Sequence, residues 1–435
     1  MAPLEIGLLV CIFTIIILLL GVPVAFGLTF VALVFILYYD GFFALSFVGE
    51  QFFSGLDDFT LISIPMFIAM GAAVASSPAG SDLYGSFERL LRKVPGGLAI
   101  SNIGACSIFS ALSGSSPATC AAIGKMGIPE MQKRGYPNTL ATGAVAAGGT
   151  LGILIPPSVT MIVYGISTGT SIGKLFLSGI GPGLLLTTLF CIWAIIHTKL
   201  YGQNISPPPP KMDFNELLLL LPKVLPFIFL VIAILFVLYG GIATPSEAAG
   251  VGAVICFALI AIVYKIWRPK QIWSILRDCT KESVMIMMII AAASLFSYML
   301  SSLFITQSTA EYIALLDLNR WALLIVINLF LLVAGFFLPP VAVIVMTAPV
   351  LLPIITNAGF DPYWFAVILT INMEIGLITP PVGLNLYVIN AIAPDIKLQE
   401  VLRGALPFAC LMVLGIVLIC LFPGIATFIP NNLGY

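Results

Sequence analysis

The fold is decided by two short stretches, GILIPP at residues 152–157 and GLITPP at residues 376–381. They lie 224 positions apart, and the same offset relates Pro129 to Pro353. Each stretch places a glycine and a Pro-Pro pair inside an apolar segment long enough to cross a bilayer. Helix breakers at that depth free backbone carbonyl and amide groups, which protein, water or a bound ion must then satisfy. Paired interruptions of this kind in the two halves of a chain indicate a transport site.

The composition is that of a membrane protein. Of the 435 residues, 60% are hydrophobic and only 9% are charged, whereas a soluble domain has about 25% charged residues. We therefore predict an all-α, polytopic membrane protein. The eight cysteines are scattered mostly through apolar runs without a CxxC motif. They are interpreted as small core residues rather than as a disulfide framework or a zinc site.

The hydropathy pattern predicts ten membrane spans and two re-entrant hairpins. The hairpins cover residues 96–133 and 320–357, and each has a helix breaker near its centre. The first arm, 96–111, would be about 24 Å long at 1.5 Å per residue, too short to cross a hydrocarbon core of about 30 Å. The predicted spans are 4–20, 22–39, 59–77, 137–170 (broken), 175–198, 224–243, 246–266, 283–305, 363–393 (broken) and 405–429.

The placement of basic residues supports this topology. With the N-terminus outside and each hairpin returning to its own side, fifteen Lys and Arg residues fall on the inner side. Only Lys174 and Arg320 fall on the outer side, and Lys125 lies within the first hairpin. Because cytoplasmic loops are enriched in Lys and Arg, both termini are predicted to be periplasmic. The spans that precede the hairpins then run in opposite directions, so the halves are predicted to be inverted repeats.

The predicted topology separates scaffold regions from transport regions. A polar linker at 199–223 contains four consecutive prolines, 207–210, which predict an extended spacer. Segments 44–58 and 268–282 are mixed in polarity and are expected to lie along the membrane surface. The regions are scaffold 1–58, first transport region 59–170, scaffold 171–282, second transport region 283–393 and C-terminal helix 394–435.

Two groups of residues around the breaks are predicted to bind Na⁺. Carbonyl and hydroxyl oxygens without a carboxylate suit a hard monovalent cation, and the C-terminal ends of half-helices attract it. The alternative is that these small residues only allow helices to pack closely. The first predicted sodium site consists of Ser113, Gly114, Ser115, Gly152 and Ile155. The second predicted sodium site consists of Gly335, Leu338, Gly376 and Thr379.

An anionic substrate is predicted to bind beside these sodium sites, because half-helix N-termini and hydroxyl groups attract anions. Lys125 is a further candidate for holding a substrate carboxylate, but snorkelling to the inner interface accounts more simply for its position. The predicted substrate-binding residues are Ser116, Pro117, Thr119, Pro156, Ser158, Pro380 and Asn385.

The remaining polar residues do not predict catalysis. Asp57, Asp58 and Glu374 have two interpretations: a functional role, as intramembrane acids often have, or a position near a membrane interface. Glu247 is interpreted as a helix-capping acid. No GxxxxGK[ST] motif is present, so ATP is not expected to supply the energy. His197 is the only histidine and has no catalytic partner in the sequence, so a membrane-embedded enzyme is a remote alternative.

Several of these stretches resemble a known family. SGSSPAT (113–119), GILIPPS (152–158) and IGLITPP (375–381) are similar to the large membrane subunit of tripartite ATP-independent periplasmic (TRAP) transporters, which is DctM-like. IPMF (64–67) and ATPSEAA (243–249) fit the same family, and the resemblance covers nearly the whole chain. It implies a bacterial inner-membrane, Na⁺-driven importer of organic acids. The implied fold is of the elevator type, in which hairpins and broken spans move against scaffold helices.

The resemblance also implies partners. A small four-helix membrane subunit and a periplasmic substrate-binding protein are expected, and no nucleic acid is expected. This chain starts at its first large-subunit span, so the small subunit is expected to be a separate polypeptide. The cargo would be a small organic acid anion: a dicarboxylate, sialic acid, sugar acid or sulfonate. The alternative within transport is a stand-alone Na⁺/carboxylate carrier that needs no binding protein.

Overall fold

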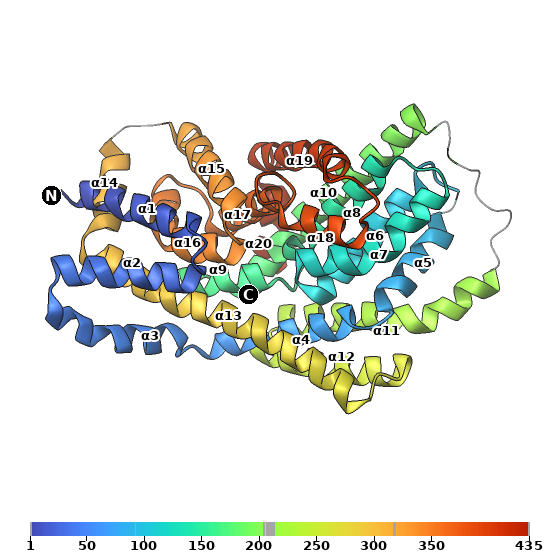
Figure 1. Ribbon diagram of the computed structural model, residues 1–435, viewed down its shortest axis with the longest axis horizontal. Coiled ribbons are helices and arrows are strands. Elements are labelled where there is room, and N and C mark those ends of the chain that lie inside the picture. The colour runs from blue at the N-terminus through green and yellow to red at the C-terminus, as the bar shows by residue number, and fades with distance from the viewer. Residues whose placement is uncertain (1, 92, 203–204, 206–213, 316–318, 434–435) are drawn as a thin grey trace.

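The computed structural model describes residues 2–91, 93–202, 205, 214–315 and 319–433 (Figure 1). Over these residues the chain is helical and contains no β-strand, which confirms the all-α prediction. The first half contains α1 (Pro3–Leu19), α2 (Val24–Tyr39), η1 (Phe42–Phe47), α3 (Val48–Leu56), η2 (Phe59–Ile62), α4 (Ser63–Ala75), α5 (Ala79–Leu91), α6 (Gly97–Ser113), α7 (Ser116–Lys133), α8 (Asn138–Leu154), α9 (Val159–Thr168) and α10 (Ile172–Tyr201). The second half contains α11 (Phe214–Tyr239), α12 (Pro245–Tyr264), α13 (Pro269–Ser302), α14 (Ile305–Leu315), α15 (Arg320–Phe337), α16 (Pro340–Asn357), α17 (Pro362–Leu377), α18 (Leu384–Ile392), α19 (Leu398–Leu421) and α20 (Gly424–Leu433).

The offset of 224 residues relates the two halves helix by helix. Subtracting it from the bounds of α16 gives 116–133, which are the bounds of α7. In the same way α15 corresponds to α6, α17 to α8, α18 to α9 and α19 to α10. The scaffold elements also correspond: α12 to α2, α14 to α5, and α13 to the stretch from α3 to α4. The repeat seen in the sequence at the two breaks therefore extends over most of the chain.

The packing of the two halves is reciprocal. Helix α7 packs against α18, and its equivalent α16 packs against α9, which is the equivalent of α18. Likewise α8 packs against α19, and α17 packs against α10. Contacts that are exchanged in this way are expected for two halves related by an approximate two-fold rotation.

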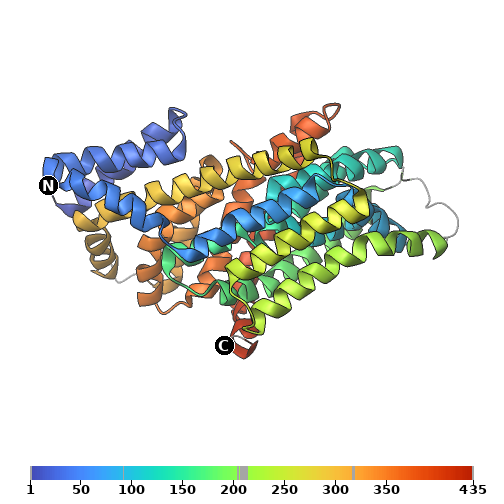
Figure 2. The same cartoon turned by 90° about the horizontal axis from the view of Figure 1, so that it is seen from below.

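The helices form two groups that lie side by side (Figures 1 and 2). Helices α2, α3, α13, α4, α12 and α11 form a long row along one side of the molecule, and most of α6–α10 and α15–α19 lie above it in Figure 1. Helix α4 packs against α12, and α13 packs against α2. Helices α4 and α13, which contain the predicted spans before the two hairpins, therefore belong to the long row.

The two broken helices form the centre of the core. Every residue of α17 from Trp364 to Leu377 is buried, and so is every residue of α8 from Leu140 to Leu154. In the 31-residue stretch Asn138–Thr168, 94% of the most apolar window is buried inside the protein. The helices that lead into the two breaks are therefore surrounded by protein.

Segment 268–282 does not form a separate surface helix. It is the first part of α13, which runs without interruption for 34 residues. No glycine or proline occurs between Lys270 and Ser302, so nothing breaks the helix there. The first half breaks in the equivalent place at Asp57 and Asp58, where α3 ends and η2 begins. The mixed polarity of residues 268–282 therefore did not mark the start of a separate helix at residue 283.

Other boundaries also differ from the prediction. Helix α10 extends to Tyr201 and α11 begins at Phe214, both inside the predicted linker; the prolines 207–210 lie outside the described residues. The predicted last span, 405–429, ends as a helix at Leu421, and Pro423 precedes the short helix α20. Helices α5 and α14 were not predicted.

Seven helices in the described part of the chain are long and apolar enough to cross a membrane, or eight if Phe42–Leu56 and Phe59–Ala75, bent by 59°, are one span. The seven include α15 and α16, with 18 residues each. Eighteen residues make about 27 Å of helix, close to a hydrocarbon core of about 30 Å. Length alone therefore does not separate a hairpin arm from a span.

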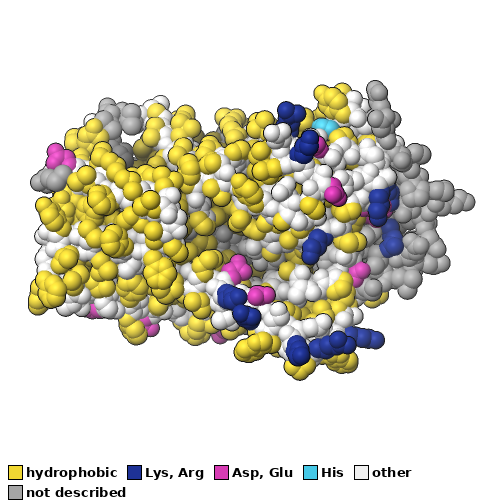
Figure 3. Space-filling model, in the orientation of Figure 1, with side chains coloured by type: hydrophobic (Ala, Val, Ile, Leu, Met, Phe, Trp, Pro, Cys, Tyr) yellow, Lys and Arg dark blue, Asp and Glu magenta, His cyan; other side chains and the backbone are white. Residues whose placement is uncertain are grey.

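The surface fits a membrane location. In Figure 3, hydrophobic side chains cover most of the left part of the visible face, and Lys and Arg side chains gather in its right part. Large apolar side chains such as Phe229 and Phe26 are 72% and 63% exposed. A wide apolar surface with its basic residues to one side is typical of a multi-pass membrane protein.

Candidate functional site

The turn between α6 and α7 lies against the break between α8 and α9. Gly114 has a left-handed backbone with φ +58°, and a Cβ added to it would lie 3.2 Å from the carbonyl oxygen of Pro157. A Cβ added to Gly152 would lie 3.1 Å from the carbonyl oxygen of Ser115. Glycine at 114 therefore allows the left-handed backbone conformation and leaves room for the carbonyl oxygen of Pro157. The structure therefore brings Gly114 and Ser115 of the predicted first sodium site close to the segment that contains Gly152 and Pro157, whereas Ile155 lies against Gly183 of α10.

The buried hydroxyl groups of this turn bond to the turn itself. The hydroxyls of Ser113 and Thr119 lie 2.8 Å apart, and Thr119 donates to the carbonyl oxygen of Ser115 at 2.9 Å. On the other side of the contact, Ser158 accepts a hydrogen bond from the Met161 amide at 3.3 Å and so caps α9. These hydrogen bonds fix the turn before α7 and the start of α9, each within its own segment.

The second half builds its contact from backbone and amide groups. Gly376 lies so close to the carbonyl oxygen of Gly335 that no Cβ fits between them. The side-chain amide nitrogen Nδ2 of Asn372 on α17 donates to the side-chain oxygen Oδ1 of Asn328 on α15. Thr379, just beyond the end of α17, donates to the carbonyl oxygen of Ile375 at 2.6 Å. Helix α15 ends at Phe337, so the carbonyls near its end have lost their helical partners.

The two breaks differ in accessibility. Pro156 and Pro157 are buried, whereas Pro380, Pro381 and Val382 are exposed. In both breaks the Pro-Pro peptide bond is cis. The second break is therefore accessible from the surface of the protein in this structure, and the first is not.

A buried hydrogen-bond chain joins the two halves. The Ser116 hydroxyl, at the start of α7, donates to Glu374 Oε2 at 3.1 Å, and the Asn385 amide donates to the Ser116 oxygen at 2.8 Å. All three side chains are at most 1% exposed. Of the two interpretations of Glu374, the interfacial one is not supported, because the side chain lies inside the protein beside α7. Its position two residues before Gly376, inside a stretch predicted to be a broken membrane span, is the signal that could have identified it.

Other candidate residues lie away from this cluster. Lys125 is exposed on α7. Asp58 accepts a hydrogen bond from the Thr60 amide at 2.8 Å and caps η2. Glu247 forms a capping box with Thr244 at the start of α12, which confirms its predicted role. The Thr244 backbone amide and hydroxyl each donate to the Glu247 carboxylate at 2.8 Å.

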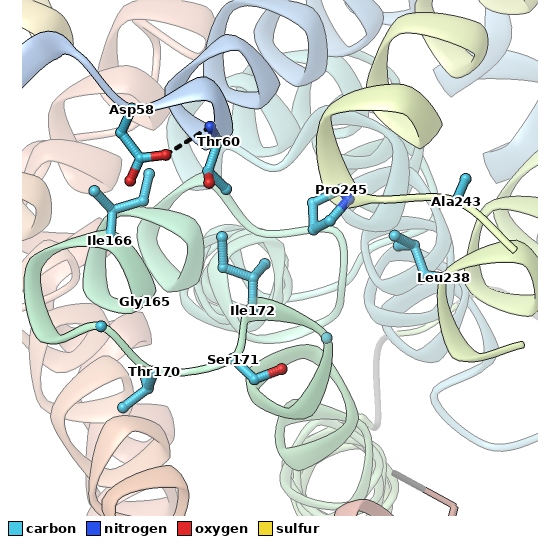
Figure 4. Close-up of a pocket in the computed structure, with 12 residues that line it drawn as sticks. Asp58, Thr60, Gly165, Ile166, Thr170, Ser171, Ile172, Leu238, Ala243 and Pro245 are labelled. Atoms are coloured by element: carbon cyan, nitrogen blue, oxygen red, sulfur yellow. Dashed lines mark hydrogen bonds between the residues drawn. The ribbon is translucent and has the colours of Figure 1, made fainter. Parts of the chain in front are cut away.

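A cavity of about 430 Å³ lies at the far end of α9 (Figure 4). Its walls come from η2, the turn between α9 and α10, and the loop between α11 and α12. None of the predicted sodium or substrate residues lines it. The lining residues are Asp58, Thr60, Gly165, Ile166, Gly169, Thr170, Ser171, Ile172, Gly173, Leu238, Ala243 and Pro245.

Comparison with known proteins identifies a family and several relatives of this chain. The chain matches the family described as tripartite ATP-independent periplasmic transporter, DctM component, over residues 10–425. It is 39% identical over 384 residues to the C4-dicarboxylate TRAP transporter large permease protein DctM of Pseudomonas aeruginosa, covering 88% of this chain and 89% of that protein. It is 33% identical over 418 residues to the isethionate TRAP transporter permease protein DctMQ of Oleidesulfovibrio alaskensis, covering 94% of this chain and 64% of that protein.

Solved structures share the fold at low sequence identity. The YdaH transporter of Alcanivorax borkumensis superimposes with a TM-score of 0.63 and 15% identity, covering 89% of this chain and 90% of that one. Similarity at this level of identity concerns the fold alone.

Proposed function

The chain belongs to the DctM component family of TRAP transporters, and on that premise we propose that it is the large permease subunit of a Na⁺-coupled importer of a small organic acid anion. Membership in this family makes it a transporter subunit and not an enzyme. Relatives are named for C4-dicarboxylate and isethionate transport. The proposed cargo is therefore a dicarboxylate, sialic acid, sugar acid or sulfonate, carried across the bacterial inner membrane.

One observation carries the proposal: in each half a glycine in the last turn of the helix before the break lies against the backbone of a neighbouring helix pair. Gly152 in α8 lies close to the carbonyl of Ser115, between α6 and α7, and Gly376 in α17 lies close to the carbonyl of Gly335, in the last turn of α15. Backbone carbonyls freed from helices in this way coordinate Na⁺ in transporters, and half-helix N-termini attract anionic substrates. In the proposal, Na⁺ binds at both contacts and the anion binds between them.

The architecture supports an elevator mechanism. The reciprocal packing of α7 with α18 and of α16 with α9 ties both helix pairs and both broken helices into one unit. The row that contains α2, α4, α12 and α13 would be the framework along which this unit moves. The helix pairs α6–α7 and α15–α16 would be re-entrant from opposite sides of the membrane, and both termini would be periplasmic. The two-fold axis would then lie in the membrane plane.

The partners follow from the tripartite family. In the proposal a small four-helix membrane subunit packs against this chain, and a periplasmic binding protein delivers the anion at the outer face. Since much of the selectivity would lie in the binding protein, a thermal-shift screen of that protein against organic acids would identify the cargo.

Proteoliposome transport tests the function. Vesicles containing both membrane subunits are supplied with binding protein and its radiolabelled acid, under an inward Na⁺ gradient or an equal K⁺ gradient. Uptake is expected only with Na⁺, and ATP is expected to have no effect. Uptake that is equal in K⁺, or that requires ATP, would reject the coupling. Undiminished uptake without the binding protein would instead identify a stand-alone carrier.

A further inference from the structure

Two buried oxygen atoms at the junction between the halves have no hydrogen-bond partner among the described residues: Glu374 Oε1 and Asn385 Oδ1. Their side chains are 1% and 0% exposed. Buried polar atoms are almost always satisfied, and a buried carboxylate needs a countercharge or a proton. An unsatisfied pair of acceptors at one place indicates a missing positively charged or donating partner.

The two atoms belong to groups that meet at one point. The other polar atoms of these groups, Glu374 Oε2 and Asn385 Nδ2, both hydrogen bond to Ser116 Oγ. The Glu374 carboxylate on α17 and the Asn385 side-chain amide on α18 therefore meet at the Ser116 hydroxyl on α7, and each has one further oxygen without a partner. These hydrogen bonds also occupy the hydroxyl proton of Ser116 and one amide proton of Asn385, which reduces what these residues can offer to an anion.

We infer that Ser116, Glu374 and Asn385 form a third Na⁺ site, separate from the two sites proposed at the breaks and resting on the proposed Na⁺ coupling. Oxygen ligands of this kind suit hard cations. The site has one carboxylate, which balances one positive charge. In the described part of the chain no group of three His, Cys, Asp or Glu residues could hold a multivalent metal, and no lysine or arginine there pairs with Glu374.

An ion bound at this site would connect the two halves of the chain. Ser116 belongs to the first half, and Glu374 and Asn385 belong to the second, 258 and 269 positions away. An ion held by all three residues ties the start of α7 to α17 and α18. Binding of this ion therefore stabilises the unit that the proposed mechanism moves.

Equilibrium binding of ²²Na⁺ to the purified membrane complex tests the site, with choline replacing Na⁺ to keep ionic strength constant. Glu374→Gln keeps the shape of the side chain and is expected to lose one bound ion per complex. The double variant Glu374→Gln/Asn385→Asp moves the carboxylate across the site and is expected to restore the ion. Glu50→Gln, which removes an exposed carboxylate on α3, is the matched control and should bind as many ions as the wild type.

A second variant, Asn385→Ala, keeps the test informative if Glu374→Gln does not fold. Asn385→Ala keeps the carboxylate, removes the amide oxygen and is expected to weaken Na⁺ affinity about tenfold or more. If folded Glu374→Gln binds as many ions as the wild type, the proposed site is wrong. An unchanged Na⁺ affinity in Asn385→Ala would also rule it out. In either case Glu374 is protonated in the protein instead of binding Na⁺. In that case Na⁺-driven uptake by the wild type still upholds the proposed function. A wild type that binds no ²²Na⁺ overturns both.

Discussion

At the scale of single residues, glycine sets the distance between backbones at the breaks. Gly376 leaves no room for a Cβ beside the Gly335 carbonyl. We expect Gly376→Ala to lower the free energy of unfolding by about 1–3 kcal/mol, the usual cost of overpacking. The measurement is the thermal unfolding midpoint of the purified protein in detergent. Gly250→Ala on α12 is the control, because its Cβ meets nothing within 4 Å and alanine favours helix. Equal midpoints for the two variants would contradict the close approach.

Hydroxyl groups at the breaks are expected to affect Na⁺ dependence more than folding. Ser115 belongs to the first predicted sodium site and Thr379 to the second. Ser115→Ala and Thr379→Ala should each raise the Na⁺ concentration needed for half-maximal uptake, while the yield of folded protein changes little. Uptake is measured in proteoliposomes across a series of Na⁺ concentrations. If both variants follow the wild-type curve, these two residues are not Na⁺ ligands.

The sequence predicted which residues surround the breaks but not how the halves connect. Gly152 and Gly376 stand out because each lies close to a Pro-Pro pair in an apolar run that would otherwise continue as a helix. The bonds of Ser116 to Glu374 and Asn385 join positions more than 250 residues apart. No local pattern encodes contacts between positions so far apart, so the sequence left the role of Glu374 open.

At the scale of elements, the breakers predicted the ends of helices well. Pro117 and Pro340 lie in the first turns of α7 and α16, where proline needs no helical hydrogen bond. Where no breaker is present, polarity alone gave the wrong boundary. Helix α13 continues through the charged residues 269–282, which were expected to be separate from the following membrane span. Helices α5 and α14 escaped prediction because they are short and, in the case of α5, amphipathic.

The turn between α6 and α7 allows a test at this scale. Gly114 and Gly169 both have left-handed backbones, with φ +58° and +66°, but only Gly114 lies against another segment. Alanine in this conformation costs about 1–2 kcal/mol. Gly114→Ala should therefore cost more stability than Gly169→Ala and should also reduce uptake. Thermal midpoints and uptake rates are compared for both variants; equal losses would mean that the contact with Pro157 contributes nothing.

At the scale of the whole molecule, the repeat is much more complete in structure than in sequence. Only the breaks preserve recognisable residues, since helices elsewhere need apolar faces rather than particular side chains. Helix bounds and reciprocal contacts reveal the rest. The sequence therefore predicted the existence of two halves, and the structure was needed to show that nearly every helix has an equivalent.

Membrane orientation is a prediction for the whole molecule. In a background with the exposed cysteines Cys11 and Cys410 replaced by serine, Lys133→Cys should react with an impermeant maleimide only from the cytoplasmic side. Arg320→Cys should react only from the periplasmic side. Both positions are exposed. Labelling is measured in right-side-out and inverted vesicles, and reaction of both cysteines from one side would exclude the proposed topology.

The central claim is that two equivalent breaks in one chain couple an anion to Na⁺. The most direct measurement follows ²²Na⁺ and the labelled acid together in the same proteoliposomes. We predict that ²²Na⁺ enters in a fixed ratio to the acid and stops entering when the acid is omitted. Entry of the acid without any accompanying ²²Na⁺ would contradict the account.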